Sequence, residues 1–269
     1  MRNCFSVGAR LLVLFASISL LMACETGMVK TYGLQDDSTG GFGRDDQRKG
    51  AGDVYVKMAV AYMEDGQIDV ALQKARQALS VEPGNAQAHN VIALLFDRLG
   101  EDALAERHFN RGMEIQPRNS YLLNAFGTFM CNRQRYTEAD ELFQKALSNP
   151  LYKTPEVALT NAGICSGRIP DIERSETYLR RALEKNPRFA PALIQMGQVS
   201  FTAGKYLSAR AYLQRYLEVA PHTAASLWLG VRTERELGDR DSEASYSLSL
   251  RNNFPDSNEA KLLMELQQK

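Results

Sequence analysis

The chain has 269 residues, of which 44% are hydrophobic, and its 32 Lys and Arg residues balance its 32 Asp and Glu residues. A chain of this length and composition buries a sizeable core, so we expect an ordered protein. The charge balance argues against a broad basic surface that would bind nucleic acid, and no acidic run predicts a highly charged tail.

Residues 1–23 have the pattern of a secretory signal peptide. Two arginines precede an apolar run from Leu11 to Met22, which is too short to span a bilayer as a helix. The run ends in Leu21-Met22-Ala23-Cys24, which resembles the lipobox of bacterial lipoproteins. The resemblance implies cleavage after Ala23 and acyl chains on the Cys24 thiol. An ordinary signal peptide that happens to contain a cysteine is the alternative.

The residues after Cys24 bear on location and on flexibility. Residue 25 is Glu, whereas Asp at this place resembles the signal that retains lipoproteins in the inner membrane, so the resemblance favours the outer membrane. Residues 24–50 are rich in Gly, Asp, Ser and Thr and lack periodicity, which predicts a flexible tether. A flexible chain of this length has an end-to-end distance of about 25 to 30 Å.

Prolines recur at nearly constant spacing through the rest of the chain. Six of them follow helical stretches at intervals of 34, 33, 37, 34 and 34 residues: Pro83, Pro117, Pro150, Pro187, Pro221 and Pro255. Such a period indicates stacked supersecondary units. With Pro83 at position 32 of a 34-residue unit, the units start near residues 52, 86, 120, 156, 190 and 224.

Small residues recur where the helices of such a unit approach each other closely. Five of six units have one at position 8, which reads Ala59, Ala93, Gly127, Gly163, Gly197 and Val231, and five at position 20, which reads Ala71, Ala105, Ala139, Ser175, Ala209 and Glu243. Position 15, the turn between the helices, is Gly in four units, where a left-handed backbone favours it. These residues resemble the tetratricopeptide repeat (TPR).

We therefore expect an all-α fold, a right-handed superhelical solenoid of six TPR helix pairs in residues 51–269. A capping helix over residues 257–267 carries Leu262, Leu263 and Leu266 on one face. This stripe is expected to cover the open end of the solenoid, whose last unit otherwise has no neighbour.

The sequence points to neither catalysis, nor a metal, nor a cofactor. His89, His108 and His222 are not at metal-ligand spacing from one another or from a cysteine. The run Gly163-Ile164-Cys165-Ser166-Gly167 has the outline of a nucleophile elbow, but that geometry requires a strand before the turn. Here the run falls inside an expected helix, so we expect a binding protein and no enzyme.

Two cysteines fall on the first helices of adjacent units. Cys131 occupies position 12 of the third unit and Cys165 position 10 of the fourth, and these helices are neighbours in a TPR stack. In an oxidising periplasm we expect a disulfide between them. Two separate reduced thiols in the core are the alternative.

Positions 2, 5, 9 and 12 of each first helix line the inner groove of a TPR array. The residues at these positions in the first two units form an apolar patch of Val56, Val60, Met63 and Leu94. We expect this patch to bind the partner, and burial under the tether or a neighbouring helix is the alternative. Trp228, at position 5 of the sixth unit, fits either the groove or the core.

The whole chain resembles the PilF/PilW family of type IV pilus lipoproteins. The resemblance rests on the lipobox, the tether, the six units and local runs, the strongest being Leu227-Trp-Leu-Gly-Val-Arg232 followed by Gly238-Asp-Arg-Asp241 and Asn253-Phe-Pro-Asp256. It implies a lipid-anchored outer-membrane protein, its TPR domain facing the periplasm, that binds the secretin PilQ and promotes its localisation or assembly. The alternatives are a TPR lipoprotein of β-barrel assembly or a regulator of periplasmic cell-wall enzymes.

Overall fold

The structure, a computed structural model, describes residues 43–169 and 171–267, with side chains from residue 50 onward. The expected signal peptide, Cys24 and the tether up to residue 42 lie outside these residues. The described part of the chain contains thirteen helices and no strand. The helices are α1 Gly43–Glu64, α2 Ile68–Val81, α3 Ala86–Arg98, α4 Asp102–Ile115, α5 Ser120–Asn132, α6 Tyr136–Leu147, α7 Pro155–Arg168, α8 Ile172–Lys185, α9 Ala190–Thr202, α10 Tyr206–Leu217, α11 Ala224–Leu237, α12 Arg240–Asn253 and α13 Asn258–Gln267.

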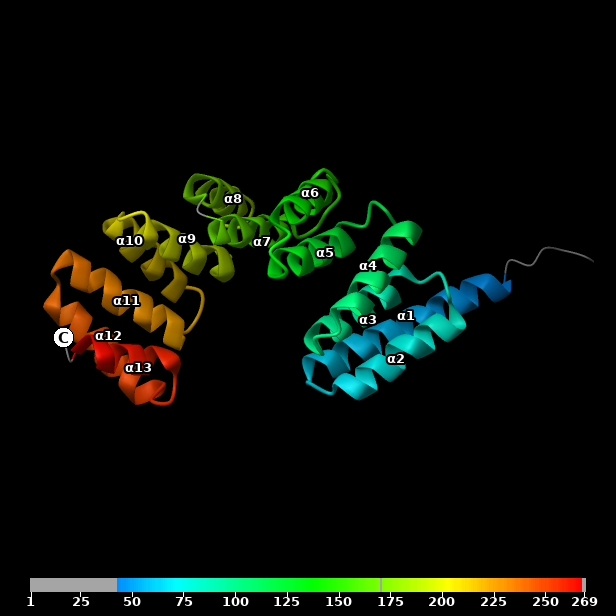
Figure 1. Cartoon of the computed structure of the whole chain (residues 1–269), viewed down its shortest axis with the longest axis horizontal. Coiled ribbons are helices and arrows are strands. Elements are labelled where there is room, and N and C mark those ends of the chain that lie inside the picture. The colour runs from blue at the N-terminus through cyan, green and yellow to red at the C-terminus, as the bar shows by residue number, and fades with distance from the viewer. Residues whose placement is uncertain (1–42, 170, 268–269) are drawn as a thin grey trace, which may run out of the picture. The chain divides into compact units, whose positions relative to one another are not determined.

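Helices α1 to α12 form six consecutive pairs, and α13 follows them (Figure 1). The two helices of each pair pack on each other, and the first helices of neighbouring pairs, such as α3 and α5, also touch. Helix α13 packs on α11 and α12. The expected all-α TPR solenoid with a C-terminal cap is therefore confirmed.

Helix α1 begins earlier than the sequence analysis expected. It has 22 residues, against 13 in α3 and in α5, and starts at Gly43 inside the stretch expected to be flexible up to residue 50. Asp45 and Asp46 lie near its start, where the helix dipole favours negative charge. Gln47, Arg48 and Lys49 have high helix propensity. The sequence analysis predicted a flexible tether from the average composition of residues 24–50, which did not reveal the short helix-forming run at its end.

The turn within five of the six pairs contains one residue in the left-handed conformation. Four of these residues are glycines, namely Gly66, Gly100, Gly204 and Gly238, with φ of 76°, 75°, 72° and 74°. The third unit has Gln134 at the same place, with φ of 61°. A side chain in this conformation costs about 1 to 2 kcal/mol, so the repeat geometry is retained there against a local penalty.

Glycines allow the closest contacts between the helices of a pair. A Cβ atom added to Gly127 would lie 2.8 Å from the Phe143 ring, and one added to Gly230 would lie 2.8 Å from the Tyr246 ring. In the sixth unit the sequence register had put Val231 at this place. The structure instead places Gly230 against α12, and the neighbouring Val231 is fully buried in the core with Leu227. The close-contact residue of this unit therefore lies one position earlier than expected.

The capping helix covers the last pair with two of its three expected leucines. Leu263 is buried and Leu266 is half-buried, and both pack against the cluster formed by Leu227, Val231 and Leu250. Leu262 is 44% exposed, so the expectation that it shares this face is wrong. Adjacent residues point about 100° apart around a helix, which prevents Leu262 and Leu263 from facing the same way.

Candidate partner-binding groove

The first helices of the first two units carry the expected apolar patch. Val56 and Val60 on α1 and Leu94 on α3 are half-buried and pack against the main core. Met63 is buried at 9% exposure and belongs to the core itself, so it does not lie open in a groove. The structure therefore keeps a partly exposed patch of three residues and corrects the inclusion of Met63.

Met63 belongs to a core cluster that also contains residues of α3. Arg98 near the end of α3 donates a hydrogen bond of 2.7 Å from Nη1 to the Met63 carbonyl oxygen. This bond holds the end of α1 against the second unit. The register of Met63 alone did not predict this contact, because it comes from a neighbouring helix.

A polar group that the sequence analysis missed lies one turn before Leu94. The side-chain oxygen of Asn90 is buried and has no hydrogen-bond partner within the described part of the chain. Buried polar atoms of native proteins are nearly always hydrogen-bonded. Within the described residues, Asn90 therefore contributes a buried acceptor without a partner to α3, the helix that carries Leu94.

The two cysteines are joined in the structure. Cys131 on α5 and Cys165 on α7 form a disulfide with their Cα atoms 5.8 Å apart. Both residues are buried, with 4% exposure each. The bond links the first helices of the third and fourth units, so it would fix the relative placement of two adjacent repeats.

The Gly163–Gly167 run lies within α7 and has no strand before it. A Cβ added to Gly163 would lie 2.7 Å from Cγ of Leu179 on α8. The first glycine of the run is therefore accounted for by helix packing, and Cys165 by its disulfide.

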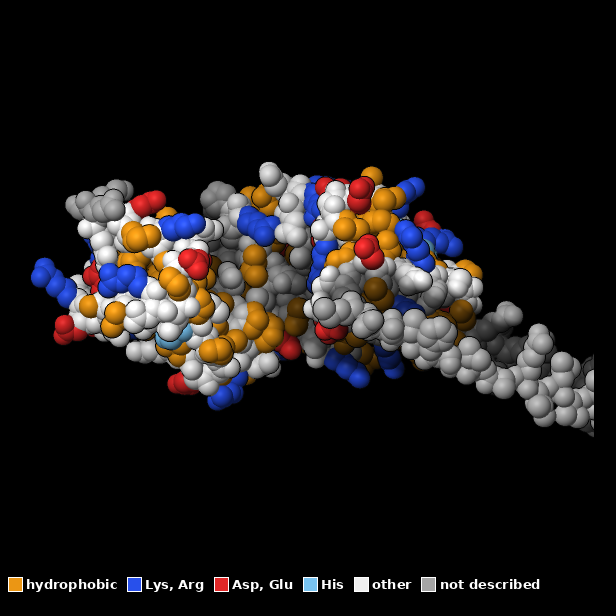
Figure 2. All heavy atoms as spheres, turned by 90° about the horizontal axis from the view of Figure 1, so that it is seen from below, with side chains coloured by type: hydrophobic (Ala, Val, Ile, Leu, Met, Phe, Trp, Pro, Cys, Tyr) orange, Lys and Arg blue, Asp and Glu red, His pale blue; other side chains and the backbone are white. Residues whose placement is uncertain are grey.

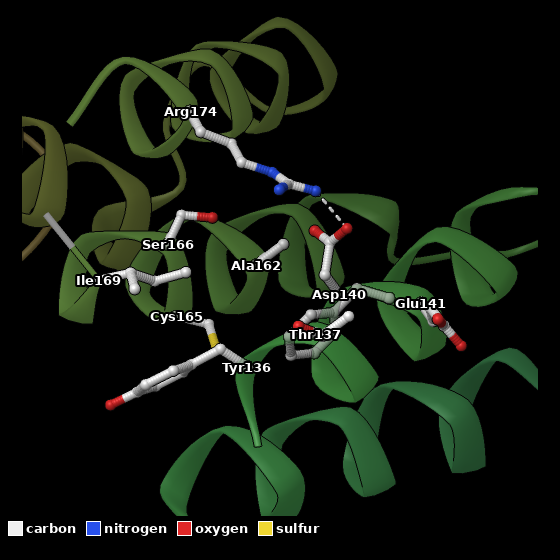
Figure 3. A pocket seen from close by; sticks show the side chains of 10 residues that line it. Tyr136, Thr137, Asp140, Glu141, Ala162, Cys165, Ser166, Ile169 and Arg174 are labelled. Carbon is white, nitrogen blue, oxygen red and sulfur yellow. Dashed lines mark hydrogen bonds and ion pairs between the residues drawn. The ribbon is translucent and has the colours of Figure 1, made fainter. Parts of the chain in front are cut away.

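Beside this run, a cavity of about 290 Å³ lies between α6, α7 and α8. Figure 3 shows that Asp140 and Arg174, which line it, point toward each other and form an ion pair. Asp140 also accepts hydrogen bonds of 2.8 Å from the Tyr178 hydroxyl and 2.5 Å from Gln144 Nε2. The Asp140 carboxylate is thus engaged by three side chains of α6 and α8, as expected for a structural network.

Two histidines meet in the second unit, where the sequence had shown no relation between them. Nδ1 of His89 on α3 and Nδ1 of His108 on α4 are 3.0 Å apart. Burial lowers the pKa of both rings, that of His108 to about 4. Among the described residues no group of three or more His, Cys, Asp or Glu side chains is arranged to hold a metal ion.

The face of the molecule drawn in Figure 2 carries side chains of both charges among its described residues. Figure 2 shows hydrophobic side chains intermixed with basic and acidic ones on the face that it presents. None of the helices in residues 43–169 and 171–267 combines the length and the apolar character needed to cross a membrane.

Stacked helix pairs of this kind define a TPR protein, and comparison with known proteins agrees. The tetratricopeptide repeat family profile matches residues 56–120 and 170–222. The type IV pilus assembly protein PilF of Pseudomonas aeruginosa is 29% identical to the chain over 242 residues, which are 90% of this chain and 94% of PilF.

Two solved structures also relate the chain to PilF and PilW. The crystal structure of PilW, described as a widely conserved type IV pilus biogenesis factor, is 30% identical with a TM-score of 0.72, and the match covers 79% of this chain and 98% of PilW. The structure of Pseudomonas aeruginosa PilF is 28% identical with a TM-score of 0.73, and the match covers 82% of this chain and 99% of PilF. The chain belongs to the PilF/PilW family of type IV pilus TPR proteins.

Proposed function

We propose that this protein is a lipid-anchored outer-membrane protein that binds the secretin PilQ and promotes its localisation or assembly in type IV pilus biogenesis. Family membership supports a role in pilus biogenesis and a protein-interaction fold. The observation that carries the choice of site is the half-buried patch of Val56, Val60 and Leu94 on the first helices of the first two units. We call these three residues the apolar groove.

The chemistry of the apolar groove fits an apolar or amphipathic segment of the partner. Fully burying a side chain of the size of Val or Leu is worth about 1.5 to 3 kcal/mol, and a half-buried one retains part of that amount for binding. An amphipathic segment would place its apolar side chains on this patch.

The proposed membrane anchoring depends on Cys24. After cleavage of residues 1–23, acyl chains on Cys24 would hold the mature protein in the outer membrane. More than one chain is needed for stable anchoring. Residues 24–42 would then connect the anchor to α1, so that the TPR domain faces the periplasm and reaches secretin subunits near the membrane.

Affinity capture from an envelope extract tests the partner. The tagged protein should retain the secretin as its principal partner, whereas capture of a β-barrel assembly protein or a cell-wall hydrolase in its place would contradict the proposal. Val60→Asp and Leu94→Asp should each weaken capture strongly, because binding would bury an unpaired carboxylate.

Leu207→Asp is the matched control, because Leu207 on α10 is 70% exposed and lies in another unit. This variant should capture the secretin as well as the unmodified protein does. Since Val60 and Leu94 also touch the core, helical content and urea unfolding are measured for each variant, and Val60→Ala serves as a milder change. Normal capture by folded Val60→Asp and Leu94→Asp would place the contact elsewhere.

A further inference from the structure

The inner positions of the first helices change character along the chain. Position 9 is apolar in the first two units, at Val60 and Leu94, but it is Gln198 on α9 and Arg232 on α11 in the last two. The C-terminal units therefore offer a different chemistry from the apolar groove.

Arg232 is held in a fixed place by aromatic rings and an amide. Its Nη2 donates a hydrogen bond of 2.9 Å to Oε1 of Gln198. Its guanidinium carbon lies 4.5 Å from the centre of the Phe201 ring and 5.6 Å from that of Trp228. Trp228, which the sequence allowed in groove or core, thus packs on the last-unit core and also supports this arginine.

The charge of Arg232 is left without compensation. Its Nε is buried and has no hydrogen-bond partner within the described part of the chain. Burial lowers the pKa of the Arg232 guanidinium, and no carboxylate of the described residues opposes this. A half-buried cation of this kind is costly unless an anion pairs with it. For comparison, Arg210 on the neighbouring α10 is paired with both Glu234 and Asp239.

A small cavity adjoins Gln198 on the side of α7. It has a volume of about 230 Å³ and lies between α7, α8 and α9, with Ile164 and Val199 among its apolar lining residues. Among the described residues that line it, Arg168 is the one charged side chain. Arg168 is oriented by a hydrogen bond of 2.8 Å from Nη1 to Oδ1 of Asn132. The cavity thus combines an apolar lining with an oriented guanidinium at its margin.

We propose that Arg168, Gln198, Arg232 and this cavity, together the arginine groove, bind an extended peptide segment of a protein partner in which Asp or Glu stands beside an aliphatic side chain. The carboxylate pairs with the half-buried guanidinium of Arg232, and the exposed positive charge of Arg168 also attracts it. The aliphatic side chain enters the cavity beside Ile164. Arginine suits this task because its planar donors match a carboxylate, and the bonds are charge-assisted. The site does not depend on the identity of the partner at the apolar groove.

Selection of random 12-residue displayed peptides on the purified protein tests the proposal. Enriched peptides should carry Asp or Glu next to Leu, Ile or Val. One enriched peptide is then synthesised with a fluorescent label, together with a copy in which Asn or Gln replaces the acidic residue, and affinities are measured by anisotropy. Since a hydrogen bond to a charged group is worth about 1.5 to 3 kcal/mol, the amide copy should bind about 10- to 100-fold more weakly.

Variants assign the effect to the arginine groove. Arg232→Gln should weaken binding of the acidic peptide by a similar factor and should not change binding of the amide copy. Arg107→Gln, at an exposed arginine of α4, removes the same charge elsewhere and should leave binding unchanged.

A role of Arg232 in folding alone is distinguished by helical content and urea unfolding of Arg232→Gln. If that variant is unfolded, Arg168→Gln tests the proposal instead. Because Arg168 is exposed, its loss should weaken binding of the acidic peptide without unfolding the chain. The proposal is overturned if no peptides are enriched, if neutral or basic peptides are enriched, or if the acidic peptide binds both arginine variants normally. Binding to anionic lipid vesicles without any peptide preference would also overturn it.

Discussion

Alanine substitutions at two glycines of α7 should change stability in opposite directions. In a helix interior Ala is favoured over Gly by about 1 kcal/mol. At Gly167 the new Cβ would meet Ser175 Oγ at 3.4 Å, an ordinary contact. Because Gly167 lies near the end of α7, Gly167→Ala should raise the free energy of unfolding by about 0.5 kcal/mol.

At Gly163 the same methyl group would collide with α8. Its Cβ would lie 2.7 Å from Cγ and 3.0 Å from Cδ2 of Leu179, a residue with no exposed surface, and 3.3 Å from the Ser175 carbonyl oxygen. Overpacking of a core costs about 1 to 3 kcal/mol, which exceeds the propensity gain. Gly163→Ala should therefore lower the free energy of unfolding by about 1 to 2 kcal/mol.

Urea unfolding followed by far-ultraviolet circular dichroism measures both variants against the unmodified protein. The expected order of midpoints is Gly167→Ala, unmodified protein, Gly163→Ala. Equal midpoints for the two variants would refute the reasoning that the first glycine is required by the contact between α7 and α8.

The remaining predictions concern the anchor, the disulfide and pH. Cys24→Ala should leave helical content unchanged but release the protein from the outer-membrane fraction; a variant still wholly in that fraction would contradict the lipid anchor. Denatured, unreduced mature protein should show no free thiol from Cys131 or Cys165. The loop closed by their disulfide contributes about 3 to 4 kcal/mol in the chain-entropy model. Two reactive thiols besides Cys24 would exclude the disulfide. Because the pKa of His108 falls from 6.5 to about 4 on folding, its ring binds more protons in the unfolded chain between these pH values, so the contribution of His108 to stability should be constant above pH 6.5 and fall below it. After allowance for solvent access to the ring, the loss is about 1 to 2 kcal/mol, and unfolding of His108→Gln should show a smaller loss over the same range.

Much of the fold could be predicted from the sequence because its determinants are local and periodic. Ala59 and Gly163 recur at one position of the unit, since every pair needs a small residue where its helices meet. The turn glycines, such as Gly66, recur for an equally local reason, the left-handed backbone conformation. A period of this kind is visible in one sequence without any knowledge of tertiary contacts.

The departures from the expected fold arise where the pattern is broken. In the sixth unit Tyr246 packs on Gly230, and this contact moves the close approach by one residue. The sequence register could not show the change, because it depends on how α12 lies against α11. The early start of α1 was missed for another reason, since the composition of the stretch masked a short run of helix-forming residues.

The candidate sites were less predictable than the fold. Inner-face positions identified Val60 and Leu94, but they did not show that Met63 is buried in a core cluster shared with the next unit. The setting of Arg232 requires three residues from two helices, Gln198, Phe201 and Trp228. The sequence showed only that a charged residue, Arg232, stands at an inner position. It did not show whether a carboxylate of the same chain pairs with that charge.

The state of the secretin in cells that lack this protein tests the central claim most directly. Outer membranes from a deletion strain and from the same strain carrying the gene are compared for secretin monomers and detergent-resistant multimers. The account predicts that multimers in the outer membrane are lost in the deletion strain and are restored by the unmodified gene but not by one carrying Val60→Asp. Normal amounts of secretin multimer in the outer membrane of the deletion strain would contradict the account.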